Sequence, residues 1–249
     1  MKKEKLRLAA VKKYLKHFPD VSDKLQDIVA LASQLTGVPV AFITLVDEDI
    51  QWITVKHGYP VDQMPRGTSF CTHTIERDEV LEVQDALLDE RFTTNPLVIN
   101  PPSVKYYAGI SLKNVDGHKV GTLCVMDIET HHLAKEQMES LKALSRQVTN
   151  IIELNLSIKY LQQSVEQIEA RNKALKKIAQ VQSHEIRGPL TSIMGVMNLI
   201  KEEDNSLHNN LYINHLDDAV KKLDEKIRYI VDISNTAHTM NADKMLKVS

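Results

Sequence analysis

A histidine with an acidic and a basic neighbour offers the clearest chemistry in the sequence: His184, Glu185 and Arg187. A neutral, accessible imidazole nitrogen can attack a γ-phosphoryl group, and a carboxylate that accepts the proton of the other ring nitrogen strengthens that nucleophile. Glu185 supplies such a general base. Arg187 lies three residues after the histidine on the same side of a helix, where it can contact phosphate or a partner's carboxylate. For His184 taken alone, a solvated surface histidine is the alternative.

A long helix is expected to position this histidine, because only Gly188, Pro189 and Gly195 interrupt the helix-forming residues from about 135 onward. Its apolar residues repeat with alternating spacings of three and four: Ile151, Leu154, Ile158, Leu161, Val165, Ile168 and Leu175. β-branched residues at the first position and mostly Leu at the second favour a parallel two-stranded coiled coil. In this phase Asn172 lies in the seam and His184 points outward. The alternative is an amphipathic helix packed on its own domain.

A second apolar stripe after a polar turn at 202–206 predicts a second helix. It consists of Ile213, Leu216, Val220, Leu223, Ile227 and Ile230. Two such helices form an antiparallel hairpin, and the hairpins of two chains close into a dimeric four-helix bundle. Pro189 removes a helical hydrogen bond beside the histidine, so we expect a bend there. The alternative is that Gly188 and Pro189 end one helix and start the next.

Residues 183–190 (SHEIRGPL) resemble the H box of histidine kinases, and residues 180–240 resemble their dimerisation and histidine phosphotransfer (HisKA) domain. The resemblance also includes residues 223–231 of the second helix. It implies that His184 accepts a phosphoryl group from an ATP-binding kinase domain, supplied in cis or in trans. It also implies that the phosphoryl group is relayed to a response-regulator receiver domain.

Two features depart from that family. Gly188 stands where many relatives have a Thr or Asn that positions water for dephosphorylation, so phosphatase activity by that route is not expected. Nothing in the sequence resembles the Asn-containing and Gly-rich boxes that bind ATP. We therefore expect no cofactor in this chain and no ATP binding, with the catalytic domain supplied by a longer protein or by a separate chain.

The N-terminal half alternates strand and turn signals and predicts a mixed α and β domain. Two strand-like runs, 40–46 and 51–56, flank an acidic turn, and two more, 107–113 and 119–126, flank Asp116-Gly117. Asp-Gly favours a tight hairpin because its turn needs positive φ. A helix over 22–36 is expected to pack on the antiparallel sheet.

Residues 20–150 resemble a GAF domain, on the segments SFCTH (69–73), DALLDERF (85–92), NPLV (95–98), YYAG (106–109) and GTLCVMD (121–127). The resemblance implies an α+β fold, with a central antiparallel sheet, helices on one side and a pocket on the other. Members of this family bind different ligands, so the ligand is unknown. The candidate pocket residues are Phe70, Cys71, His73, Arg91 and Tyr107.

Three clusters have competing interpretations. Cys71 with His73 is similar to a bilin-attachment neighbourhood, but Thr72 intervenes, and a small buried Cys is the alternative. An anion pocket could combine Arg66, Arg91, Lys105 and Tyr107, or Arg91 could instead pair with Asp85 or Asp89. The adjacent His131 and His132 are better read as a solvated loop than as a metal site, so no metal is expected.

Composition excludes several other classes of protein. The formal net charge of -2 lacks the basic excess that nucleic acid attracts. The longest apolar run is far shorter than the ~20 residues that cross a bilayer, and the N-terminus lacks an apolar signal region. We expect a cytoplasmic protein with no nucleic-acid or membrane partner, in which the two cysteines stay reduced.

The predicted organisation is a GAF sensory domain with an N-terminal helix (1–150), a coiled-coil signalling helix (151–180), a HisKA hairpin (181–240) and a tail (241–249). The predicted function is that of the sensory and phosphoacceptor region of a homodimeric histidine kinase. One alternative is a non-catalytic dimeric GAF module or scaffold that regulates a kinase. Another is a chromophore-bearing photoreceptor fragment.

Overall fold

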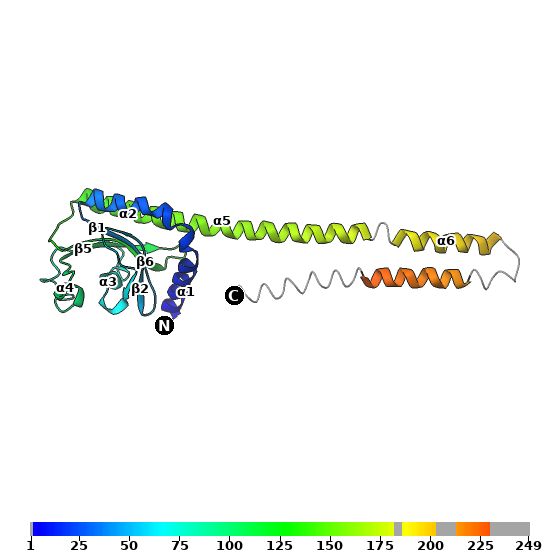
Figure 1. Cartoon of the computed structure of the whole chain (residues 1–249), viewed down its shortest axis with the longest axis horizontal. Coiled ribbons are helices and arrows are strands. Elements are labelled where there is room, and N and C mark those ends of the chain that lie inside the picture. The colour runs from blue at the N-terminus through cyan, green and yellow to red at the C-terminus, as the bar shows by residue number, and fades with distance from the viewer. Residues whose placement is uncertain (1, 182–185, 203–212, 230–249) are drawn as a thin grey trace. The chain divides into compact units, whose positions relative to one another are not determined.

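The computed structural model describes residues 2–181, 186–202 and 213–229. The chain divides into two compact units, Met1–Tyr160 and Leu161–Ser249 (Figure 1). Of the predicted features, His184, Glu185, the turn at 203–206, Ile230 and the tail at 241–249 lie outside the described residues.

The first unit is built on a six-stranded sheet in the order β3-β2-β1-β6-β5-β4. Its strands are β1 (Val40–Val46), β2 (Ile50–His57), β3 (Gln63–Pro65), β4 (Leu81–Val83), β5 (Tyr106–Lys113) and β6 (Lys119–Asp127). Each neighbouring pair is antiparallel, so both predicted hairpins and the predicted sheet are confirmed. Gly117, with a φ of 79°, makes the tight turn between β5 and β6.

Helices α1 (Lys2–His17), α2 (Ser22–Thr36) and the first part of α5 (Lys135–Val181) belong to the same unit, with a short 3-10 turn, η1 (Phe18–Asp20), between α1 and α2. Figure 1 shows α2 and α5 along one face of the sheet. One apolar core joins these helices to the strands through Tyr14, Leu25, Ile43, Leu123, Leu141, Val148 and Ile152. The predicted helix over 22–36 is therefore confirmed, and it ends where Gly37 adopts a φ of 73°.

The opposite face of the sheet carries short elements and a second core. These elements are η2 (Arg66–Thr68), α3 (Phe70–Thr74) and α4 (Pro96–Ile99). The core under them contains Phe42, Ile53, Phe70, Cys71, Phe92, Tyr107 and Cys124. Side chains therefore fill the face on which the sequence predicts a ligand pocket.

The helix α5 continues from the first unit into the second. Ile152 and Leu156 still pack on the sheet, whereas the predicted seam residues Leu154 and Leu161 are 63% and 61% exposed. The second unit also contains α6 (Arg187–Glu202) and a helix over 213–229. Gly188 and Pro189 lie in the first turn of α6. The coiled-coil dimer and the four-helix bundle stay predictions.

None of the helices in the described ranges is both long and apolar enough to cross a membrane.

Candidate functional site

The short helix α3 brings three of the predicted pocket residues onto one face of the sheet. Ser69 caps the helix by accepting a hydrogen bond from the Cys71 backbone N–H at 3.0 Å. Phe70 and Cys71 then point into the second core, where they meet Tyr107 of β5. Gly109 is required beside this tyrosine, because a Cβ there would lie 2.2 Å from the Tyr107 hydroxyl.

The aromatic ring of Phe92 connects this group to the remaining predicted residues. Its centroid lies 4.2 Å from that of Phe70 and 5.1 Å from that of His73. The guanidinium carbon of Arg91 lies 5.1 Å from the same centroid, and Phe70 in turn stacks on Tyr107 at 5.1 Å. All five predicted residues therefore belong to one connected cluster. The central residue of the cluster, Phe92, was not among the predicted pocket residues, although it lies in the segment 85–92.

Polar groups converge on the Cys71 thiol inside this core. The Cys71 Sγ lies 3.8 Å from Cys124 Sγ, and it accepts hydrogen bonds from Thr122 Oγ1 at 3.1 Å and from Tyr107 at 3.5 Å. Thr74 Oγ1 also lies 2.6 Å from the Tyr107 hydroxyl. Buried polar groups need partners to offset their lost hydration, and these groups supply partners to one another.

These contacts shift the ionisation of the three groups in different directions. Burial acts to raise the pKa of Cys71, but the hydrogen bonds from Cys124, Thr122 and Tyr107 outweigh it and lower that pKa. The contact with Cys71, together with burial, raises the pKa of Cys124. Burial also raises the pKa of Tyr107. The contact between the two thiols therefore lowers the pKa of Cys71 and raises that of Cys124.

A buried amide beside the start of α3 is only half satisfied. Gln51 of β2 accepts a hydrogen bond from the Ser69 hydroxyl through its Oε1, while its Nε2 has no hydrogen-bond partner among the described residues. An unpaired buried donor of this kind costs about 1 to 3 kcal/mol.

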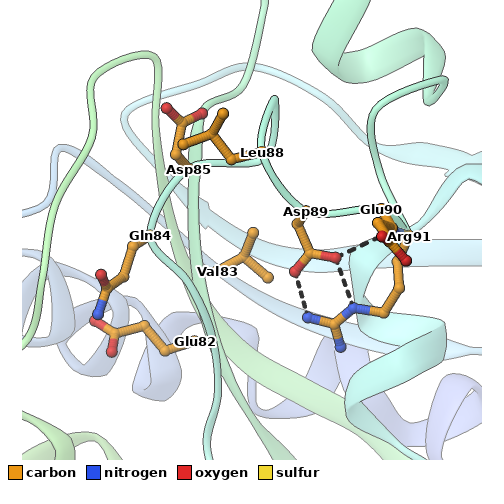
Figure 2. A pocket seen from close by; sticks show the side chains of 8 residues that line it. All are labelled: Glu82, Val83, Gln84, Asp85, Leu88, Asp89, Glu90 and Arg91. Atoms are coloured by element: carbon orange, nitrogen blue, oxygen red, sulfur yellow. Dashed lines mark hydrogen bonds and ion pairs between the residues drawn. The ribbon is translucent and has the colours of Figure 1, made fainter.

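An open pocket lies at the edge of the sheet next to β4 (Figure 2). It is lined by Glu82, Val83, Gln84, Asp85, Leu88, Asp89, Glu90 and Arg91. Arg91 donates to Asp89 through Nε at 2.8 Å and through Nη2 at 2.5 Å. This pairing lowers the pKa of Asp89 and raises that of Arg91. Arg91 therefore forms an ion pair with Asp89 rather than contributing to an anion pocket.

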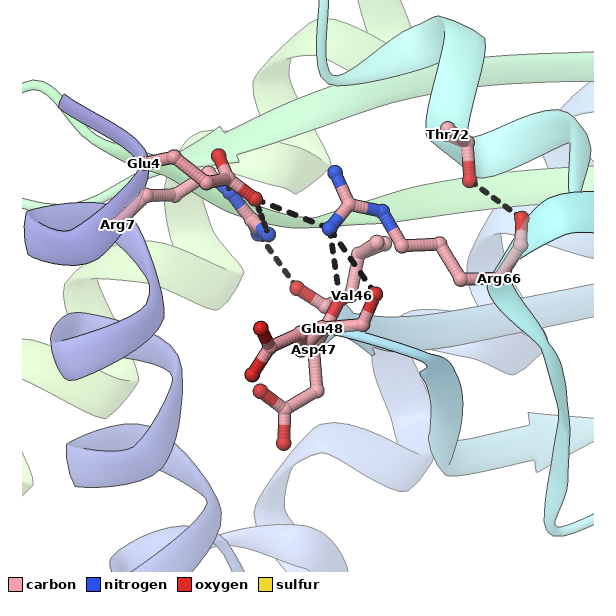
Figure 3. A network of polar contacts seen from close by, with 7 residues as sticks. All are labelled: Glu4, Arg7, Val46, Asp47, Glu48, Arg66 and Thr72. Carbon is pink, nitrogen blue, oxygen red and sulfur yellow. Dashed lines mark hydrogen bonds and ion pairs between the residues drawn. The ribbon is translucent and has the colours of Figure 1, made fainter. Parts of the chain in front are cut away.

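The predicted anion pocket is not assembled, since Arg66 is also paired elsewhere. It donates to Glu4 of α1 at 3.0 Å and to the Asp47 carbonyl at 3.1 Å (Figure 3). The histidines 131 and 132 lie against Asp127 and Glu82, at 2.6 and 3.3 Å. Within the described ranges, no group of three or more His, Cys, Asp or Glu residues could hold a metal ion.

The sequence matches the GAF domain family over residues 20–152, which is more than half of the chain. The chain belongs to the GAF family. Its filled core therefore occupies the GAF face on which a pocket is expected, and α3 covers it.

A protein with a known activity is similar to the GAF region of this chain. A cyclic di-GMP phosphodiesterase of Pseudomonas aeruginosa is 36% identical over 137 residues, which are 55% of this chain and 23% of that protein. The chain thus spans about a quarter of that relative's length.

Solved GAF domains of phosphoenolpyruvate-protein phosphotransferases are also similar. The one from Coxiella burnetii is 15% identical, with a TM-score of 0.48, and covers 62% of this chain and 96% of its own. The one from Acinetobacter is 16% identical, with a TM-score of 0.46, and covers 62% and 98%.

A charged cluster connects the N-terminal helix to the GAF core (Figure 3). Glu4 accepts from Arg7 at 2.7 and 2.8 Å and from Arg66 at 3.0 Å, while the buried Arg7 also donates to the Val46 carbonyl. The Arg66 carbonyl in turn accepts from Thr72 of α3 at 2.7 Å. We call the residues Glu4, Arg7 and Arg66 the α1 clasp.

The other end of α1 contacts the long helix. Tyr14 donates to Glu153 of α5 at 2.5 Å, and Glu153 also accepts from the Val115 backbone N–H at 3.2 Å. Burial and the hydrogen bond to Glu153 raise the pKa of Tyr14, so the phenol stays protonated. Continuous contacts therefore run from α3 through the α1 clasp and α1 to α5.

Proposed function

We propose that this chain is the sensory and phosphoacceptor region of a cytoplasmic sensor histidine kinase. The observation that carries the proposal is the sequence SHEIRGPL at 183–190, whose last four residues begin α6. The GAF domain receives a chemical cue, α5 transmits it, and His184 accepts a phosphoryl group and passes it to an aspartate of a receiver domain. Glu185 acts as the general base, and Arg187 contacts phosphate.

The two helices after the motif support this proposal. The helix α6 and the helix over 213–229 line one groove together, as the two arms of a hairpin do. Its walls are Gly188, Pro189, Ser192, Gly195, Val196 and Leu199 on one side and His215, Asp218, Ala219 and Lys222 on the other. Gly188 and Pro189 of the motif are part of this groove, which supports the proposal that the motif belongs to a helical hairpin.

Exposed apolar side chains support a homodimer. The seam residues Leu154, Ile158, Leu161, Val165, Ile168 and Leu175 of α5 are all exposed, as are Ile213, Val220 and Ile227 of the second stripe. Side chains of this size gain about 1.5 to 3 kcal/mol each when they are buried. A second copy of the chain, paired along α5 and through the hairpins, would bury them in a coiled coil and a four-helix bundle.

The proposed function also requires three partners: an ATP-binding kinase domain, a GAF ligand and a receiver domain. ATP is bound by a kinase domain in cis or in trans, and the GAF ligand is a small molecule not yet identified. A receiver domain takes the phosphoryl group from His184.

Phosphorylation in trans tests this function. The purified chain is incubated with labelled ATP, with and without a separately purified catalytic domain of a histidine kinase. We expect label only when the catalytic domain is present, in a form that is lost in acid and retained in base. The variant His184→Gln should lose it, whereas His215→Gln, which alters a histidine of the hairpin groove, should keep it. Equal labelling of both variants would contradict the proposal.

A GAF regulatory module with a different output is the second candidate. The observation that favours it is the cyclic di-GMP phosphodiesterase that shares this region at 36% identity. In this case His184 carries no phosphate, and the dimeric module binds and regulates a kinase or another enzyme. A kinase whose activity changes on adding this chain, without label on the chain, would support this second function.

A further inference from the structure

We propose that Cys71 and Cys124 form a redox-sensitive pair, which a hydroperoxide converts to an intramolecular disulfide that fastens α3 to β6. The two Sγ atoms are 3.8 Å apart, although 53 residues separate the cysteines in the chain. A disulfide needs a separation of about 2.05 Å, so the atoms have to approach by roughly 1.8 Å. No part of this inference depends on phosphate at His184.

The two cysteines lie on elements of very different rigidity. Cys124 is in the middle of β6, where it is paired with Phe42 of β1 on one side and with Gly109 of β5 on the other. Cys71 is in α3, a helix of five residues. A short helix is held by few hydrogen bonds of its own, so α3 supplies the movement that closes the distance.

The surroundings of Cys71 suit it to react first. The hydroxyl groups of Thr122 and Tyr107 donate hydrogen bonds to the Cys71 sulfur, and the Cys124 thiol contacts the same sulfur. Hydrogen bonds of this kind stabilise a thiolate, which is the nucleophilic form of cysteine. Cys124, whose pKa the same contact raises, keeps its proton and is left as the second, resolving thiol.

Access for the oxidant depends on α3. Both cysteines are buried, so a hydroperoxide reaches Cys71 only when α3 moves outward. The Ser69 hydroxyl at the start of the helix donates to Gln51 Oε1 of β2, so this hydrogen bond has to break when α3 moves outward. The rate of oxidation therefore reports how far α3 has opened.

The chemistry balances in two steps. The Cys71 thiolate, whose own proton has passed to solvent, attacks one oxygen of the hydroperoxide. The O–O bond breaks and leaves a sulfenic acid on Cys71 and an alkoxide, which takes that proton back from solvent to become the alcohol. The Cys124 sulfur then attacks the Cys71 sulfur, forming the S–S bond and releasing hydroxide, which becomes water with the thiol proton. Two thiols are oxidised, and the hydroperoxide is reduced to an alcohol and water.

The disulfide would hold the pocket face closed. It would join α3 directly to β6, and β6 leads through residues 128–134 into α5. Outward movement of α3 is then prevented, so oxidation fixes the GAF domain in the conformation with a filled core.

The experiment treats the native full-length chain with hydrogen peroxide and counts free thiols. The chain has two cysteines, so an intramolecular disulfide has only one possible pairing. We expect both thiols to be lost, a mass lower by two hydrogen atoms, a linked peptide containing Cys71 and Cys124, and full recovery with dithiothreitol. Amide hydrogen exchange in α3 should slow on oxidation.

Two outcomes overturn the proposal. In the first, both thiols persist in the native chain and are oxidised only after unfolding in urea, which would make the pair ordinary core packing. In the second, the disulfide links two chains, which a non-reducing gel shows as a covalent dimer.

Matched variants test the assigned roles. In Cys124→Ala the reaction should stop at a sulfenic acid on Cys71, which dimedone captures. In Cys71→Ala the remaining Cys124 thiol should react at least 10-fold more slowly. Equal rates for the two single variants, with both folded by circular dichroism, would contradict the assignment of Cys71 as the attacking thiol.

Discussion

The variant Glu4→Gln removes the negative charge of the α1 clasp while keeping the size of the side chain. Hydrogen bonds from Arg7, and then from Arg66, lower the pKa of Glu4 from 4.5 to about 2. A shift of that size corresponds to about 3.4 kcal/mol at full strength. The Glu4 side chain is 44% exposed, so solvent screening reduces the expected loss of unfolding free energy to about 1 to 2 kcal/mol.

The effect has a defined dependence on pH. The carboxyl of Glu4 has a lower pKa in the folded chain than in the unfolded chain, so its contribution is complete above the unfolded value of about 4.5. It is lost as the pH falls through that value toward about 2. The difference in stability between the wild type and Glu4→Gln should therefore be constant from pH 7 to pH 5.5 and should shrink steadily below pH 4.5.

Urea unfolding followed by tryptophan fluorescence measures this difference, because Trp52 is the single tryptophan and lies in β2 of the GAF unit. The matched control is Glu48→Gln, an exposed residue whose backbone carbonyl, rather than its carboxylate, accepts from Arg66. Its effect should stay within about 0.5 kcal/mol. A Glu4→Gln chain that is as stable as the wild type at pH 7, or a difference unchanged at pH 3, would refute the reasoning.

Phe92→Ala should destabilise the GAF unit by about 3 to 5 kcal/mol, because the ring is buried and contacts Phe70. The control variant Phe92→Leu should lose less than half as much unfolding free energy. Equal losses for the two variants in urea unfolding would exclude a specific role for the ring. Asn172→Leu should stabilise the dimer by about 1 to 3 kcal/mol, because the seam would no longer bury an amide. A lower melting temperature of that variant would show that Asn172 faces solvent and that the heptad phase is wrong. The chain alone should show no ATP hydrolysis and no labelling by ATP, and labelling without a kinase partner would contradict this expectation.

Local features of the fold were predictable from the sequence. The Asp116-Gly117 turn fixes the β5-β6 hairpin because only a few residue types accept positive φ, and the apolar spacing of α2 identifies its buried face. The order of the six strands was not predictable in the same way. It places β6 between β1 and β5, a pairing decided by contacts between residues about 80 positions apart, such as Thr44 and Thr122.

The residues of the candidate site were predictable from short segments of the sequence, whereas most of their contacts were not. Phe70, Cys71, His73, Arg91 and Tyr107 were selected from short segments, and they form one cluster. Its long-range contacts could not be read from sequence spacing: Cys71 meets Cys124, and Arg66 meets Glu4, only because the sheet brings distant segments together. Arg91 with Asp89 is the exception, since two neighbouring residues in a turn can pair locally.

Locating phosphate on the chain tests the proposed role of His184. The full-length protein is phosphorylated by a separate histidine kinase catalytic domain with ATP, and the modified residue is identified by mass spectrometry under alkaline conditions. A purified receiver domain is then added. We predict phosphate on His184 alone, and its transfer to the receiver aspartate within the assay. An unmodified His184 in chains that are folded and dimeric, with several catalytic domains tried, would contradict the account and favour the regulatory module.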